Sequence, residues 1–167
     1  MARRPMGRQP PRPSPVRRCR PTPPLPPPAE CPPGAAQAME ELALMDGEGN
    51  HLIEIHPFQA DYRTVRPGPV TIRVANGRGW GKLPGGTLIT GQLLFGERVQ
   101  ACLTQAYTPD GKSYPVCLEV HSNTRWGWAK EKGSGQDTAV VSGGGTLRPV
   151  ERFGEASRYN QPPPRFD

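Results

Sequence analysis

Residues 106–121 constrain the fold more than any other stretch, because they predict a β-hairpin where a motif search would report a phosphate-binding loop. The triplet Gly111-Lys112-Ser113 resembles the end of such a loop, but Ala106 stands where the motif requires glycine. A phosphate-binding loop also runs into a helix, whose N-terminal N–H groups hold the phosphates. This segment alternates instead between two faces, one with Tyr114, Val116, Leu118 and Val120 and the other with Pro115, Cys117, Glu119 and His121. A period of two is typical of a strand, and the preceding Pro109-Asp110-Gly111 is typical of a turn.

The rest of the chain reads as short strands separated by turn residues. Besides the strand that ends at Val120, strands are expected at 52–55, 70–74, 87–95, 98–107, 138–141 and 147–153. Gly96-Glu97 predicts a two-residue hairpin turn. Residues 34–45 are the one expected helix, because their apolar side chains recur at helical spacing. The fold class is therefore mainly β, a small antiparallel sandwich or barrel with one short N-terminal helix, over residues 34–153.

Proline and arginine set the N-terminal end apart. Thirteen of the 23 prolines precede Gly34, so residues 1–33 are expected to be a disordered tail with polyproline II character. Residues 154–167 are expected to be a second disordered tail. Residues 1–29 hold seven arginines and no acid, so their net charge is +7. Since the whole chain has a net charge of +6, residues 30–167 have a net charge of −1. The tail can make nonspecific contacts with anionic partners, whereas the body offers no electrostatic reason to bind nucleic acid or lipid.

Residues 20–26 within the tail fit an SH3-ligand pattern, which would make the chain an adaptor acting through its proline-rich arm. The alternative is a stiff linker. No apolar run reaches the roughly 18 residues of a membrane span, and no apolar segment follows the early arginines to form a signal peptide. A start upstream of Met1 would add an export segment, so the compartment is either the cell envelope or the cytoplasm.

Several short motifs together resemble a known domain. They are Cys31-Pro32-Pro33-Gly34-Ala35, Met39, Trp80-Gly81-Lys82-Leu83-Pro84, Gly86-Thr87, Gly91, Arg98-Val99, Leu103-Thr104, Thr108-Pro109-Asp110-Gly111 and Tyr114-Pro115-Val116-Cys117. Over about residues 31–153 the chain resembles a domain at the C-terminal end of many myxobacterial serine/threonine protein kinases. There the domain follows a membrane segment and a Pro-rich linker. The resemblance implies an accessory, extracytoplasmic binding or sensory module, with an unidentified protein or cell-envelope ligand as its partner.

The chain is not expected to be an enzyme or to hold a cofactor. Residues 77–81 do not match the glycine-rich loop of a kinase, and none of the other kinase motifs is present. No catalytic residue can be assigned by the usual combinations of nucleophile, base and acid. Cys117, Glu119 and His121 are ligand types on one strand face, with His51 or His56 to complete a set, but strand residues four apart lie ~13 Å from each other. We therefore expect no metal site.

The resemblance bears on two of the four cysteines, since Cys31 and Cys117 lie in motifs like those of the family. If the protein is exported, we expect a disulfide between them, which would join the start of the helix to the third hairpin strand. In a cytosol two reduced thiols would be the default. Cys102 would then be a buried free thiol or a residue on the polar face.

Trp126 and Trp128, flanked by Arg125 and Lys130, form the most site-like surface in the sequence. If this segment is extended, both indoles lie on one face near a cation, which suits a sugar ring. The chain would then be a glycan- or cell-wall-binding module. The alternative is that the two tryptophans cap the open end of a small barrel.

Overall fold

The computed structural model describes residues 30–44, 53–55, 62–75, 79–122 and 125–154. Most of the two expected tails, including the SH3-ligand pattern at 20–26, lies outside these ranges. None of the described segments forms a helix with the length and apolar character needed to cross a membrane.

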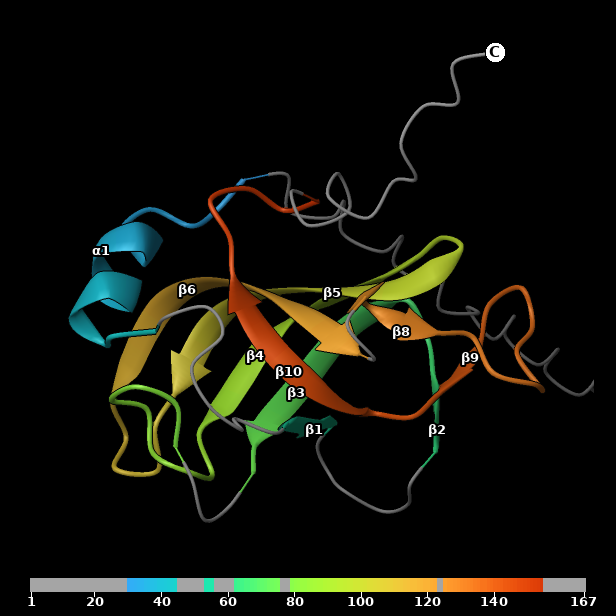
Figure 1. Ribbon diagram of the computed structural model, residues 1–167, viewed down its shortest axis with the longest axis horizontal. Helices are drawn as coiled ribbons and strands as arrows, with labels where there is room; N and C mark the ends of the chain where they lie inside the picture. Colours follow the sequence, from blue (N-terminus) through green and yellow to red (C-terminus); the bar gives the residue numbers. More distant parts are fainter. Residues whose placement is uncertain (1–29, 45–52, 56–61, 76–78, 123–124, 155–167) are drawn as a thin grey trace, which may run out of the picture.

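Six antiparallel strands close into a barrel (Figure 1). They are β1 (Ile53–Ile55), β3 (Gly68–Val74), β4 (Leu88–Phe95), β5 (Arg98–Tyr107), β6 (Ser113–Ser122) and β10 (Gly144–Pro149). From β1 to β6 each of these strands pairs with the next one along the chain, and β10 closes the ring by pairing with both β6 and β1. The prediction of a mainly β, antiparallel fold with one short helix is confirmed. The sequence left a sandwich and a barrel open, and the strand pairing forms the barrel.

Side chains fill the interior of this barrel. Alternate residues of β3, namely Val70, Ile72 and Val74, are buried, as the period of two requires. Trp80 and Trp128 are the largest fully buried side chains. A barrel of six strands is too narrow for a ligand channel, so its inward residues pack against one another.

Both predicted hairpins are present. Tyr107 pairs with Ser113 across the Pro-Asp-Gly turn. Phe95 pairs with Val99, so the other connection has three residues, 96–98, instead of the predicted two. The register between β5 and β6 shifts between Leu103 and Gln105, which is a bulge in the ladder.

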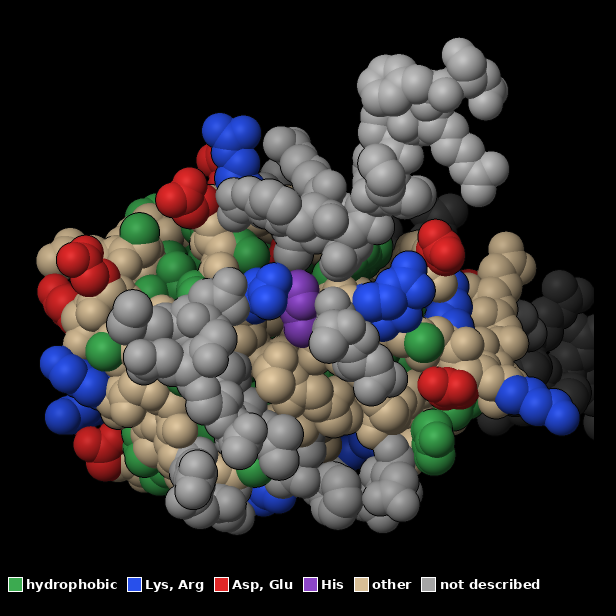
Figure 2. Space-filling view, in the orientation of Figure 1, with side chains coloured by type: hydrophobic (Ala, Val, Ile, Leu, Met, Phe, Trp, Pro, Cys, Tyr) green, Lys and Arg blue, Asp and Glu red, His purple; other side chains and the backbone are tan. Residues whose placement is uncertain are grey.

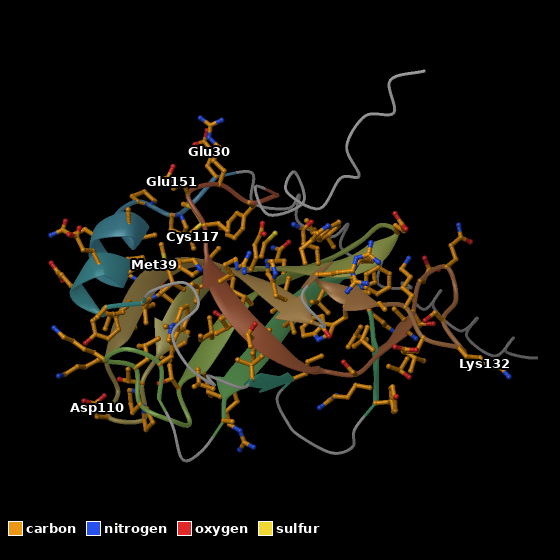
Figure 3. The ribbon with its side chains drawn as sticks, viewed as in Figure 1. Glu30, Met39, Asp110, Cys117, Lys132 and Glu151 are labelled. Carbon is orange, nitrogen blue, oxygen red and sulfur yellow. A yellow bond between two sulfur atoms is a disulfide. The ribbon has the colours of Figure 1, made fainter. Side chains whose placement is uncertain are left out.

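Helix α1 (Ala35–Glu41) is shorter than the expected 34–45. It ends because Ala43 takes a positive φ of 54° and the Leu44 N–H donates to the Met39 carbonyl at 3.0 Å, a Schellman-type stop. The apolar face of α1 packs on β6, and the Cys117 N–H donates to the Met39 thioether sulfur at 3.4 Å (Figure 3). The helix therefore covers the outer face of β6 at Cys117.

Four short strands complete the fold. β2 (Arg63–Val65) pairs with β9 (Ala139–Val141) beside the barrel, on the side away from α1 (Figure 1). β7 (Arg125–Trp126) pairs with β6, and β8 (Trp128–Ala129) pairs with β5. The expected strand at 138–141 is β9, and the one at 147–153 lies earlier, as β10. Neither β2 nor the β7–β8 pair was expected.

A disulfide joins Cys31 to Cys117, the pairing that was expected, with 5.3 Å between their Cα atoms. Glu30 forms an isolated bridge with Arg152, and the sulfur of Cys31 lies 3.1 Å from the Glu151 carbonyl oxygen. Figure 3 shows Glu30 and Glu151 at the same edge of the molecule. Residues 30–33 therefore belong to the domain, whereas the sequence assigned them to the tail.

The disulfide spans 86 residues, so removing it should destabilise the domain by roughly 2–4 kcal/mol through the added freedom of the unfolded chain. We expect the double substitution Cys31→Ala with Cys117→Ala to lower the free energy of unfolding by this amount and so to lower the urea midpoint. Reductant should lower the midpoint of the unaltered protein to the same value and leave that of the double variant unchanged. The prediction would be contradicted if reductant left the urea midpoint of the unaltered protein unchanged.

Candidate functional site

The predicted pair of exposed indoles is not found. Trp128 is fully buried, and its Nε1–H donates to the Gly144 carbonyl at 2.7 Å, so it closes one end of the barrel. Trp126 is half-buried and Arg125 is exposed. Of the two alternatives raised for these tryptophans, Trp128 follows the one in which it caps the barrel. Trp126 and Trp128 do not share a binding face.

Gly127 is the reason that the two indoles separate. Its φ of +69° breaks the alternation that would otherwise place residues two apart on one face. Its N–H donates to the Val120 carbonyl at 2.7 Å, and a Cβ at this position would lie 2.4 Å from the Val99 carbonyl oxygen. Residues 125–129 thus form a strap that pairs with β6 through β7 and with β5 through β8.

Arg98 holds the strap in place. Its Nε and Nη2 groups donate to the carbonyl oxygens of Trp126 at 2.8 Å and Gly127 at 2.9 Å. Burial lowers the pKa of the Arg98 guanidinium from its usual value, the charge of Arg125 lowers it further, and Glu97 opposes them. The function of Arg98 is therefore to position the strap.

The cations expected near the tryptophans separate in the same way. Lys130 places its Nζ 5.3 Å from the centre of the Phe95 ring, a cation–π contact with the β4–β5 hairpin. Arg125 stays exposed at the edge of the sheet, next to Trp126. The aromatic surface left for a ligand at this edge is the half-buried ring of Trp126.

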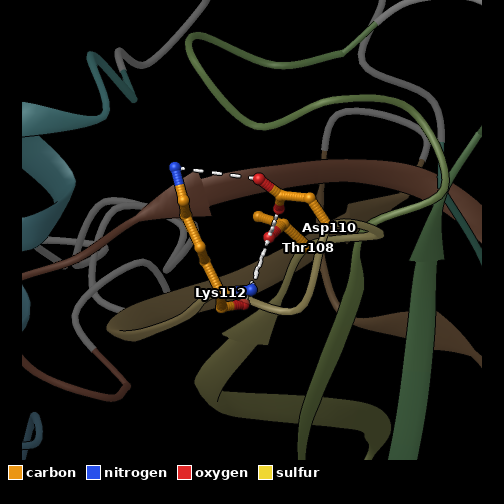
Figure 4. A network of polar contacts seen from close by, with 3 residues as sticks. All are labelled: Thr108, Asp110 and Lys112. Atoms are coloured by element: carbon orange, nitrogen blue, oxygen red, sulfur yellow. Dashed lines mark hydrogen bonds and ion pairs between the residues drawn. The ribbon is translucent and has the colours of Figure 1, made fainter.

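The Gly-Lys-Ser triplet lies in a turn (Figure 4). The Lys112 N–H donates to Thr108 Oγ1 at 3.1 Å, and the Gly111 N–H donates to the Thr108 carbonyl at 3.0 Å. The Lys112 Nζ lies 3.7 Å from Asp110 Oδ2. The hydrogen bond from the Thr108 hydroxyl lowers the pKa of the Asp110 carboxyl, and the charge of Lys112 lowers it further. These N–H groups and this ammonium interact within the turn, as expected for a hairpin, and do not form a phosphate-binding loop.

The outward side chains of β6 are buried as well, which the sequence did not indicate. Cys117 is held in the disulfide under α1, and Glu119 accepts hydrogen bonds from the Gly154 N–H and from Gln100 Nε2. Burial and, to a smaller extent, the charge of Glu119 together raise the pKa of the neighbouring Cys102 thiol to about 12. A thiol with so high a pKa is a poor nucleophile at neutral pH.

No group of three or more His, Cys, Asp or Glu side chains within the described ranges is placed to hold a metal ion. Cys117 is committed to the disulfide, so it cannot act as a thiolate ligand. His121 is buried, and His51 and His56 lie outside the described residues.

A pocket of about 490 Å³ lies where β2 leads into β3, and none of the sites expected from the sequence included it. Its lining residues are Ile55, Arg63, Val65, Arg66, Pro67, Pro69, Val70, Thr71 and Leu93. The local sequence Arg66-Pro67-Gly68-Pro69, a cation followed by a rigid turn, is the feature from which it could have been found. In Figure 2, Lys and Arg side chains are scattered among acidic and polar ones, so the view shows no broad basic surface.

Comparison with known proteins identifies no relative. No family model matches the chain, and no curated protein and no solved structure shows a significant similarity to it.

Substituting Gly127 should loosen the strap. We expect Gly127→Ala to destabilise the domain by about 3 kcal/mol, since it combines a positive φ with the close approach of the Val99 carbonyl. Gly111→Ala is the matched control, because Gly111 also has a positive φ, of 87°, but a Cβ there meets nothing within 4 Å. That control should cost about 1 kcal/mol. Equal losses for the two variants in urea unfolding would show that the strap does not depend on this approach.

Proposed function

We propose that this chain is a non-enzymatic binding or sensory module that works in an oxidising compartment, as the kinase-associated domain it resembles is expected to do. The observation that carries the proposal is the Cys31–Cys117 disulfide. Disulfides persist in extracellular and periplasmic proteins and are rare in a reducing cytosol.

The state of the polar side chains supports a binding role over a catalytic one. Lys112, Glu119 and Cys102 are the groups that a search for catalysis would test first. Lys112 pairs within its own turn, Glu119 anchors the chain at Gly154, and the Cys102 thiol is held protonated. Since side chains also fill the barrel interior, a ligand would bind on the outer surface.

The redox state of the cysteines in the natural host tests the compartment. Cells are quenched with N-ethylmaleimide, and the protein is unfolded and digested. We expect the peptides with Cys31 and Cys117 to stay unlabelled until they are reduced, and the peptide with Cys102 to be labelled directly. Direct labelling of both Cys31 and Cys117 would overturn the proposal.

Glycan binding is a second candidate function, in which the ring of Trp126 alone would contact the sugar because Trp128 is buried. The observation in its favour is that Trp126 is partly exposed next to the exposed Arg125. One aromatic ring with a neighbouring cation can stack on one sugar.

Retention on insoluble peptidoglycan tests this candidate. We expect Trp126→Ala to abolish retention, because the stacking surface is lost. Tyr62→Ala is the control, since Tyr62 is the most exposed aromatic side chain among the described residues, with 61% of its surface accessible. Retention that survives Trp126→Ala, or that falls equally in the control, would remove glycan binding at this edge.

A further inference from the structure

We propose that the pocket between β2 and β3 binds small organic anions that carry an apolar body, with the acid group at Arg66. This goes beyond the proposed function, because it assigns a ligand class to a surface that none of the expected sites included. The inference rests on the floor, the rim and the charge of the pocket.

The floor of the pocket is apolar and already desolvated. Ile55, Val70 and Leu93 are buried in the barrel core, with 4%, 8% and 2% of their surfaces accessible. They present the edge of the core to the pocket where β3 begins and β4 ends, since Gly68 pairs with Leu93. An alkyl or aryl group placed there would lose water-exposed area, which favours binding by about 25 cal/mol per Å².

The rim is rigid before any ligand arrives. Pro67 and Pro69 have fixed φ angles, and Gly68 between them takes a φ of +117° that other residues rarely adopt. Arg63 donates from Nη1 to the Ile55 carbonyl at 3.3 Å, which ties β2 to the end of β1. A pre-organised rim reduces the entropy lost on binding.

The charge of the lining selects the ligand. Two of the nine lining residues are arginines, and none is acidic. Arg66 is exposed, and Arg63 is half-buried beside the apolar floor. A guanidinium binds a carboxylate through two parallel hydrogen bonds, so a carboxylate with an apolar tail complements both parts of the pocket.

Hexanoate is the probe, titrated into ¹⁵N-labelled protein, with hexanamide as the neutral analogue and acetate as the tailless one. We expect hexanoate to shift the amide signals of residues 63–71 and Leu93 along one saturable curve. It should bind at least tenfold more tightly than acetate, because the tail is buried, and about fivefold more tightly than hexanamide.

Two variants separate the pocket from general charge effects. Arg66→Gln should weaken hexanoate binding about fivefold and leave hexanamide binding unchanged, since only the acid group loses its partner. Arg125→Gln is the matched control, because Arg125 is also exposed and lies on the β7–β8 strap; it should change neither affinity. The amide spectra of the variants show whether each is folded.

The proposal is overturned if the shifts map elsewhere, if hexanamide binds as tightly as hexanoate, or if Arg66→Gln and Arg125→Gln have the same effect. The thiol-trapping experiment has no part in these outcomes. The ligand class and the oxidising compartment can therefore fail separately.

Discussion

The structure depends on burying β6 on both of its faces. Val116, Leu118 and Val120 point into the barrel, as an amphipathic strand requires. The opposite face is buried too, and there the covering comes from the two ends of the domain. Helix α1 and the disulfide lie over Cys117, and the chain that follows β10 reaches Glu119 through the Gly154 N–H. The strand is thus the point at which the ends of the domain meet the barrel.

This arrangement explains why a carboxylate can lie in so apolar a place. Glu119 is fully buried, and a buried carboxylate is expensive unless it receives hydrogen bonds. Two donors to it, Gln100 and Gly154, come from β5 and from the segment after β10. The carboxylate therefore joins three parts of the chain.

The sequence predicted most of the barrel because its long strands carry a local signal. Each strand of six or more residues overlaps an expected one, and both hairpins were located, although the turn after Phe95 is one residue longer than predicted. The two-residue strands β7 and β8 carry no periodicity, so only their partners on β6 and β5 define them. β2 has three residues and pairs with β9, some 75 residues away in the chain.

The prediction at the candidate site failed for the same reason, because the conformation there depends on distant contacts and not on the local sequence. An extended Trp-Gly-Trp segment would place both indoles together, and the inference failed because Gly127 adopts a positive φ to fit against Val99. Nothing in the local sequence distinguishes such a glycine from one in a regular strand. The disulfide was expected only through a resemblance of motifs, because two cysteines 86 residues apart carry no local signal for pairing.

The placement of the covered and the open surfaces indicates how the domain would face a ligand. α1 and the Glu30–Arg152 bridge close over the outer face of β6, where both flanking segments of the chain leave the domain. The strap and the arginine pocket lie instead where β5 and β3 begin, since Phe95 pairs with Val99 and Leu93 pairs with Gly68. The exposed Arg66 lies there, at the rim of the pocket whose apolar floor is the buried edge of β3 and β4.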